Sequence, residues 1–201
     1  MRVGLVPISA KPYHAGHHAL VSTASKENDK VMLFVSVSDR LRKNEFPIYG
    51  NDMLRVWKEE LEKIMPANVE IEYGGSPVRK VYEKLGDAND RLETNTYTVY
   101  SDPEDTAQNY AESMRQKYFS DIYRRGHVVF AAEASPESFT RGIGTPDISG
   151  TKVREMLKSG DIVSFAKIMP PGVDVENIFS ILSKQINEMW LRSYIRSIIT
   201  G

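Results

Sequence analysis

Three of the four histidines of the chain lie within five residues, in the segment PYHAGHHALV at residues 12–21. His14 and His17 are three residues apart, so both rings can face one pocket where a helix starts between them. Gly16 allows a ligand to approach the backbone closely because it has no side chain. Imidazole N–H groups donate hydrogen bonds to phosphate oxygens, and the free N–H groups of a helix start attract anions. This segment therefore predicts an anion site at the beginning of a helix.

A second segment with the marks of a helix start is DISGTKVREMLKSGD, at residues 147–161. Ser149 or Thr151 can cap the helix, and Gly160 can end it. Val153 and Leu157 lie on the face that would turn inward, while Arg154 falls within the first turns. The pattern predicts a short amphipathic helix with a polar beginning.

The intervening elements alternate between short apolar runs and helical patterns, which is typical of an α/β fold. The continuous runs VGLV at 3–6 and VMLFVSV at 31–37 predict strands that are buried on both faces. Further strands are predicted at 69–73, 97–100 and 127–131, helices at 19–26, 51–65, 78–85 and 106–119, and loops at 87–95 and 132–146. For the 51–65 helix, Asn51 or Asp52 is the expected N-cap.

We therefore expect a Rossmann-like parallel sheet of about five strands, with helices on both faces. Ligands of such sheets bind beyond the carboxyl ends of the strands, where the histidine segment falls. The break Pro170-Pro171-Gly172 suggests a main domain at 1–172 and a helical extension at 173–201, with one long helix at 175–195. That helix could cap the domain or form a homo-oligomer contact, and the sequence does not choose between them.

The composition is that of a globular chain, with 201 residues, 41% hydrophobic residues and 26% charged residues. The formal net charge of −1 gives no support for nucleic acid or a membrane surface as a partner. No apolar run approaches the roughly 18 residues that a membrane span needs. Cysteine is absent, which excludes disulfides and fits a cytoplasmic location.

The two segments together resemble a known enzyme superfamily. PYHAGH resembles the H-x-G-H signature of the nucleotidyltransferase superfamily, and ISGTKVR at 148–154 resembles its second signature, I-S-[SGT]-T-x-x-R. SGTKVREMLKSGD, followed by IMPPGV, is similar to the archaeal-type nicotinamide mononucleotide (NMN) adenylyltransferases. FPIYGNDMLRVW, at 46–57, loosely resembles their P-F-T-x-x-E-R segment.

The resemblance implies transfer of a nucleoside monophosphate from a nucleoside triphosphate to a small phosphate-bearing acceptor, with release of pyrophosphate. ATP and NMN, giving NAD, are the first expectation, with Mg²⁺ accompanying the triphosphate. The implied catalytic residues are His14 and His17 on the α-phosphate and Arg154 on the departing pyrophosphate. The implied nucleotide-binding residues are Ile8, Ser9, Gly16, Ser149, Gly150 and Thr151.

The chain departs from the family pattern at two arginines. The family has G-R-F-Q-P where this chain has ISAKP, so the arginine falls on Ser9, and Lys11 is the expected catalytic substitute. The arginine of the E-R pair falls on Met53, leaving Asp52 alone. Contacts to the second substrate are expected from loops after the second and fourth strands, at Ser38, Arg40, Arg42, Ser101 and Asp102, with Arg141 on a flap at 141–147.

Several alternatives remain open at this stage. A cytidylyltransferase, or an adenylyltransferase with another acceptor, would share both motifs. A nucleotide-binding sensor without turnover would explain the missing arginines. His14, His17 and His18 could form a metal cluster, but adjacent helical residues point in different directions and no nearby carboxylate completes a site. The loop residues assigned to the second substrate could equally be solvated.

Overall fold

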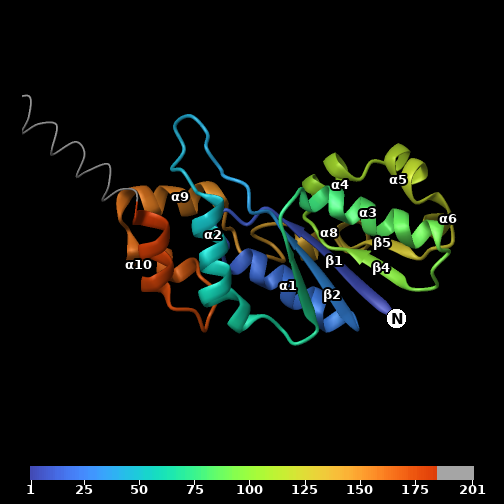
Figure 1. The fold of residues 1–201 in the computed structure, drawn as a ribbon, viewed down its shortest axis with the longest axis horizontal. Coiled ribbons are helices and arrows are strands. Elements are labelled where there is room, and N and C mark those ends of the chain that lie inside the picture. Colours follow the sequence, from blue (N-terminus) through green and yellow to red (C-terminus); the bar gives the residue numbers. More distant parts are fainter. Residues whose placement is uncertain (185–201) are drawn as a thin grey trace, which may run out of the picture.

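In the computed structural model, which describes residues 1–184, five parallel strands form one sheet in the order β3-β2-β1-β4-β5 (Figure 1). The strands are β1 (Arg2–Ile8), β2 (Lys30–Val35), β3 (Val69–Tyr73), β4 (Thr96–Val99) and β5 (Val128–Phe130). This confirms the predicted Rossmann-like α/β fold and its strand number. Because β1 lies between β2 and β4, the chain changes direction across the sheet at β1, and a crevice forms at that point in folds of this kind.

Helices cover both faces of the sheet (Figure 1). One group comprises α1 (Ala15–Glu27), α2 (Gly50–Val56), α9 (Gly150–Ser159) and α10 (Ile162–Ile168). The other comprises α3 (Pro77–Asp90), α4 (Pro103–Asn109), α5 (Glu112–Tyr118) and α6 (Ser120–Arg124). Two short helices, α7 (Ala131–Ala134) and α8 (Pro136–Phe139), follow β5. They occupy part of the segment 132–146 that we expected to be a loop.

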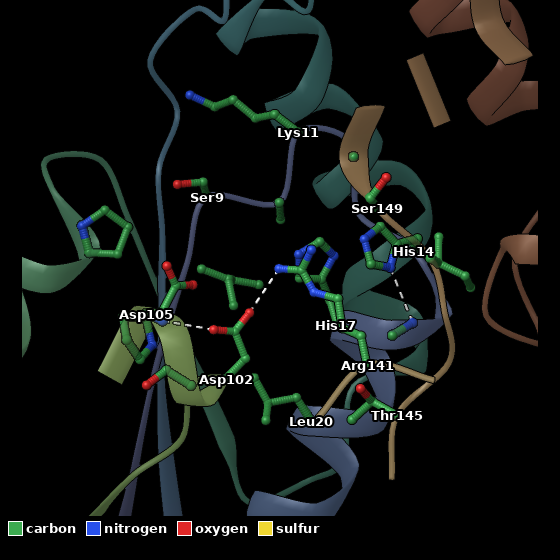
Figure 2. Close-up of a pocket in the computed structure, with 18 of the residues that line it drawn as sticks. Ser9, Lys11, His14, His17, Leu20, Asp102, Asp105, Arg141, Thr145 and Ser149 are labelled. Carbon is green, nitrogen blue, oxygen red and sulfur yellow. Dashed lines mark hydrogen bonds and ion pairs between the residues drawn. The ribbon is translucent and has the colours of Figure 1, made fainter. Parts of the chain in front are cut away.

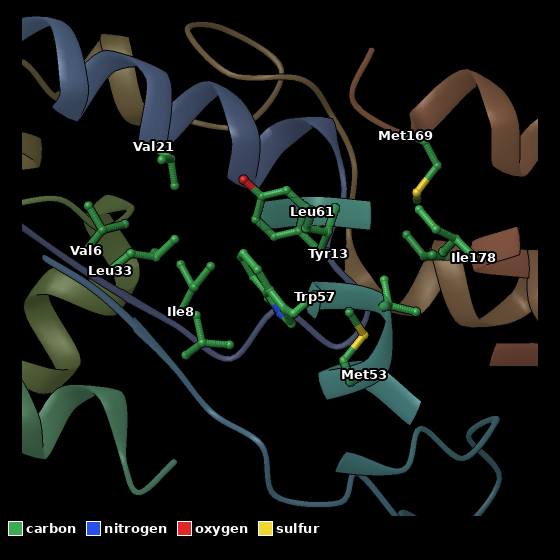
Figure 3. Packing of buried hydrophobic residues seen from close by; sticks show 14 of the residues in the cluster. Val6, Ile8, Tyr13, Val21, Leu33, Met53, Trp57, Leu61, Met169 and Ile178 are labelled. Carbon is green, nitrogen blue, oxygen red and sulfur yellow. The ribbon is translucent and has the colours of Figure 1, made fainter. Parts of the chain in front are cut away.

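Alternating side chains of β1 build two separate cores. Val6 and Ile8 face the core under α1, α2 and α9, whereas Val3 and Leu5 face the core under α3. Figure 3 shows the first core, where the rings of Trp57 and Tyr13 fill the space between β1 and α2. All four β1 side chains are at most 5% exposed, so β1 is fixed from both faces and holds the loop that follows it.

The predicted helix at 106–119 is wrong, because the chain breaks it into α4 and α5. Tyr110 leaves helical geometry, with φ −128° and ψ 46°, and its carbonyl accepts a hydrogen bond from Nε of Arg115 at 2.5 Å. The Arg115 guanidinium is buried, lies 3.8 Å from the ring centre of Phe130 and pairs with Glu133. A buried guanidinium needs partners on several sides, and the break supplies one of them.

The predicted N-caps of the 51–65 helix are also wrong. The helix begins at Gly50, and the carboxylate of Asp39 accepts a hydrogen bond from the N–H of Gly50 at 2.7 Å. The capping group therefore comes from eleven residues upstream, which local patterns do not reveal. α2 ends at Val56 and continues as a π turn (Trp57–Leu61) and a 3-10 turn (Glu62–Ile64). α3 runs to Asp90, into the predicted loop 87–95, because Ala88 adds one more buried contact.

The first part of the C-terminal extension, residues 175–184, is helical and packs on the first core. Ile178, Ile181 and Leu182 are at most 4% exposed there, and the amide of Asn177 donates to Glu60 at 2.8 Å. The rest of the predicted helix at 175–195 lies outside the described residues. Within residues 1–184, no helix has the length and apolar character needed to cross a membrane.

Candidate functional site

A cavity of about 550 Å³ opens at the carboxyl ends of β1 and β4, where the sheet changes direction (Figure 2). The turn after β1, the turn after β4, the start of α1 and the start of α9 all contribute to its walls. Most of the residues proposed from sequence line it, namely Ile8, Ser9, Lys11, His14, Gly16, His17, Arg40, Ser101, Asp102, Arg141, Ser149, Gly150, Thr151 and Arg154. The fold thus brings together two segments that lie more than 130 residues apart in sequence.

His14 is the N-cap of α1. Its Nδ1 accepts a hydrogen bond from the N–H of Gly16 at 3.2 Å, so the proton of the neutral ring lies on Nε2. The Nε2–H group of His14 remains available for a ligand in the cavity. A Cβ on Gly16 would lie 3.0 Å from the His14 ring, so the glycine provides the space in which the imidazole caps the helix.

His17 lies one helical turn further along, and its ring centre is 3.9 Å from that of His14. Burial lowers the pKa of His14 to about 4, with Arg141 acting in the same direction. Burial lowers the pKa of His17 well below its ordinary value, and His14 and Arg141 lower it further. Both imidazoles are therefore neutral near pH 7 and act as hydrogen-bond donors rather than as cations.

Tyr13 holds His17 in place, a role that the sequence analysis missed. The Tyr13 ring stacks on His17 with centres 5.5 Å apart and meets Trp57 edge-on at 4.9 Å. It is 2% exposed, so core packing fixes it. The only available signal was a large aromatic residue directly before His14.

Arg154 connects the two motif segments. Its guanidinium donates to the carbonyl of Lys11 and to the hydroxyl of Thr151, both at 3.0 Å, and pairs with Glu45 at 3.1 Å. It is 4% exposed, and its Nε has no partner among residues 1–184. Arg154 therefore reaches the cavity wall with most of its donors already bound by the protein.

The start of α9 has the predicted geometry. Ser149 is the N-cap and accepts a hydrogen bond from the N–H of Lys152 at 3.3 Å, while Gly160 ends the helix with φ 74°. A Cβ on Gly150 would lie 3.0 Å from the Arg154 guanidinium, so a glycine is required for the close approach. The other N–H groups of the first turn point toward the N-terminal end of α9, which lies at the cavity.

Lys11 does not lie as expected for a phosphate ligand. Its ammonium group donates to Ser36 Oγ at 3.2 Å, to Ser38 Oγ at 2.8 Å and to the carbonyl of Ser38, and the side chain points away from both imidazoles (Figure 2). Burial lowers its pKa. Ser38, expected at the second substrate, serves as a partner of Lys11 and is not among the described residues that line the cavity.

The other residues expected to contact the second substrate come from the loop after β4 and the loop after β2. Ser101 is buried and shares a hydrogen bond with Thr106 at 2.7 Å, and Asp102 caps α4 and pairs with Arg141 at 2.8 Å. Arg40 lines the cavity and pairs with Glu45, whereas Arg42 is exposed and does not line it.

Met53 stands where the family pattern has the second of its missing arginines, and its side chain is part of the hydrophobic core.

Asp105 lines the cavity beside Asp102 and was missed by the sequence analysis. Although the residue contacts solvent, the cavity walls around its carboxylate raise its pKa, and Asp102 adds to that effect. No residue in the described part of the chain forms an ion pair with it. Tyr110, whose hydroxyl is buried without a partner within the same part, lines the cavity nearby.

Within residues 1–184, no three histidine, aspartate or glutamate side chains gather in an arrangement that could hold a metal ion. The pair of His14 and His17 lacks the carboxylate that would complete such a site.

No family model matches the chain, and no curated protein matches it in sequence. Among solved structures, one match is the crystal structure of Thermotoga maritima TmcAL bound with alpha-thio ATP. The sequence identity is 13%, the TM-score is 0.35, and the match covers 93% of this chain and 56% of that chain. This chain thus spans little more than half of that protein's length. The fold assignment rests on the strand order and helix layers described above.

Proposed function

We propose that the protein is a nucleotidyltransferase that transfers a nucleoside monophosphate from a nucleoside triphosphate to an acceptor phosphate. The observation that carries this proposal is the convergence of His14, His17 and Arg154 on one cavity at the sheet's switch point. The hydrogen bond from Arg154 to the Lys11 carbonyl places the two motif segments in direct contact. This geometry, together with the resemblance of both segments to the superfamily signatures, supports the proposal.

In the proposed reaction, an oxygen of the acceptor phosphate attacks the α-phosphorus of the triphosphate. A new P–O bond forms, the bond between the α-phosphorus and the bridging oxygen breaks, and pyrophosphate leaves with that oxygen. Neutral His14 and His17 donate hydrogen bonds to α-phosphate oxygens, where negative charge increases in the transition state. The start of α9 and Arg154 stabilise the charge of the departing pyrophosphate. Mg²⁺, brought by the triphosphate, would neutralise phosphate charge.

We further propose NMN as the acceptor and ATP as the donor, so that the product is NAD. Asp105 supports an acceptor with a positively charged ring, because its carboxylate lacks an ion-pair partner in the described part of the chain and lies in the cavity wall. The neighbouring Asp102 is already paired with Arg141. A pyridinium ring would give Asp105 the opposite charge that it lacks.

The proposal is tested by measuring pyrophosphate release from ATP with NMN and Mg²⁺. A panel of CTP, GTP and UTP, combined with other small phosphate acceptors, distinguishes an NMN adenylyltransferase from a cytidylyltransferase or a related enzyme. Release of pyrophosphate that requires both the triphosphate and the acceptor would support nucleotidyl transfer. Absence of release with every combination would reject it.

A second candidate is a nucleotide sensor without turnover. The observation that favours it is the binding of two cationic groups by the protein itself, Lys11 by Ser36 and Ser38 and Arg154 by Glu45. A sensor would bind a nucleoside triphosphate in calorimetric titrations and release no pyrophosphate. In that case His17→Ala would weaken binding with no turnover to lose.

A further inference from the structure

The carboxylate of Glu45 lies between two guanidinium groups at the edge of the cavity. Nε and one terminal nitrogen of Arg40 contact the two Glu45 oxygens at 2.9 Å and 3.2 Å. Arg154 contacts one of the same oxygens at 3.1 Å. Arg40 and Arg154 both line the cavity, whereas Glu45 is not among the described residues that do. The two arginines thus share one anion, which the chain supplies from outside the cavity.

Burial of the charged Arg154 guanidinium costs free energy unless an anion lies beside it. Its side chain is 5% exposed, and its hydrogen bonds to Lys11 and Thr151 satisfy donors without neutralising its charge. Burial lowers the pKa of Arg154, and Glu45 opposes that shift. Two positive groups this close repel each other unless an anion lies between them. The structure therefore contains a position that requires negative charge.

Glu45 lies at a point where its side chain can leave this position while the backbone stays in place. The segment 41–47 is closed by paired backbone hydrogen bonds between Arg40 and Ile48, at 2.7 Å and 3.1 Å. Phe46 and Ile48 are buried in the core and anchor one side, while residues 41–44 are exposed. Rotation of the Glu45 side chain toward solvent would free both guanidinium groups without disturbing these anchors.

We propose that Arg40 and Arg154 form a subsite for the terminal phosphates of a polyphosphate, and that Glu45 competes for it as an internal anion. The proposal rests on the proposed function for the identity of the anion, and it assigns Arg40 to the pyrophosphate side rather than to the acceptor. A phosphate group offers more charge and more acceptor oxygens than a carboxylate, so it can replace Glu45. Return of Glu45 would then favour release of pyrophosphate.

The test is calorimetric titration of the full chain with inorganic pyrophosphate and with tripolyphosphate. Glu45→Gln keeps the size of the side chain and removes its charge, so it should lower the Kd for both anions by roughly 3- to 30-fold. Glu83→Gln is the matched control, because Glu83 forms an exposed pair with Arg79 at 2.8 Å on α3, outside the lining of the cavity. It should leave both Kd values unchanged.

A double-variant comparison separates competition from a general change of charge. In the Arg40→Gln background, Glu45→Gln should give a much smaller gain in pyrophosphate affinity, because the shared subsite has lost one of its two guanidinium groups. Thermal melting of each variant shows whether the protein stays folded. The proposal is overturned if Glu45→Gln weakens polyphosphate binding or leaves it unchanged while the protein stays folded.

Failure of this proposal is distinguishable from failure of the proposed function. If pyrophosphate is released from ATP and an acceptor but Glu45→Gln does not alter pyrophosphate affinity, nucleotidyl transfer stands and the internal competitor is wrong. If no triphosphate is turned over but Glu45→Gln tightens pyrophosphate binding, the anion subsite stands and the enzyme proposal fails. If neither the original chain nor Glu45→Gln binds pyrophosphate, the subsite is wrong, and the turnover assay alone decides the enzyme proposal.

Discussion

The rings of His14 and His17 lie 3.9 Å apart, centre to centre, at the start of α1, and burial keeps both of them neutral near pH 7. Two neutral imidazoles can lie this close, whereas two imidazolium ions would repel each other strongly. The two neutral rings can therefore both donate hydrogen bonds to one anionic group.

Removal of either imidazole should reduce the rate of the proposed nucleotidyl transfer. His14→Ala or His17→Ala takes away one donor to the α-phosphate, which is expected to lower kcat by about 10²-fold or more. His127→Ala is the control, because His127 is outside the described cavity lining and its ring contacts the carbonyl of Glu93. It should keep activity close to that of the original chain. Equal losses in all three variants would contradict the roles given to His14 and His17.

The free energy of unfolding should fall as the pH is lowered, because protonation of His14 and His17 favours the unfolded chain. The folded-state pKa of His14 is about 4, below its ordinary value of 6.5, so the unfolded chain binds more protons between these pH values. The stabilising contribution is full above pH 6.5 and declines toward pH 4, by up to about 3 kcal/mol for His14. His17 acts in the same direction. Denaturant melts of the original chain and of His14→Gln from pH 7 to pH 4 measure this difference, and parallel curves would contradict it.

A methyl group at Gly16 should reduce activity without reducing stability. The added Cβ would lie 3.0 Å from the His14 ring and push it from its capping position, so we expect a loss in kcat of about tenfold or more. The helix gains up to about 1 kcal/mol from alanine, which offsets a cost of similar size for displacing the His14 cap. Gly86→Ala, in α3 with its nearest contact at 3.7 Å, should show that gain with unchanged activity. Full activity in Gly16→Ala would show that the His14 ring needs no such space.

Removal of the Asp105 charge should affect the acceptor and not the triphosphate. With Asp105→Asn, the KM for NMN should rise about tenfold, since the pyridinium ring loses an opposite charge. Nicotinic acid mononucleotide, whose ring also carries a carboxylate, should be affected less or used better. Glu104→Gln changes an exposed carboxylate outside the described lining of the cavity and serves as the control. An unchanged KM for NMN, with normal turnover, would remove the support that Asp105 gives to this acceptor.

The sheet and both motif helices could be predicted because their signals are local. The apolar runs around Val6 and Leu33 are long enough to show strands that are covered on both faces, and Ser149 and Gly160 mark the ends of one helix directly. Helix patterns failed where a side chain bonds the backbone in a way that the helical period does not show. Asp39 caps α2 from an upstream loop, and Arg115 interrupts what would otherwise continue as one helix.

The same limit applies to the candidate site. The sequence pointed to His14, His17 and Arg154, since family-like motifs and helix starts mark them. It did not reveal that Glu45 and the Lys11 carbonyl are partners of Arg154, because these contacts join segments separated by more than 100 residues. Lys11 was expected on a phosphate, but the two serines after β2 that bind its ammonium group became visible only in three dimensions.

The ring of Tyr13 is shared between the interior of the domain and the reactive end of α1, with Trp57 on one side and His17 on the other. Repacking of the interior is therefore transmitted to the imidazole. A cavity-creating change as far inside as Trp57 should therefore shift the His17 ring as well as destabilise the fold, so the proposed turnover and the stability of this chain are coupled from that side of the sheet.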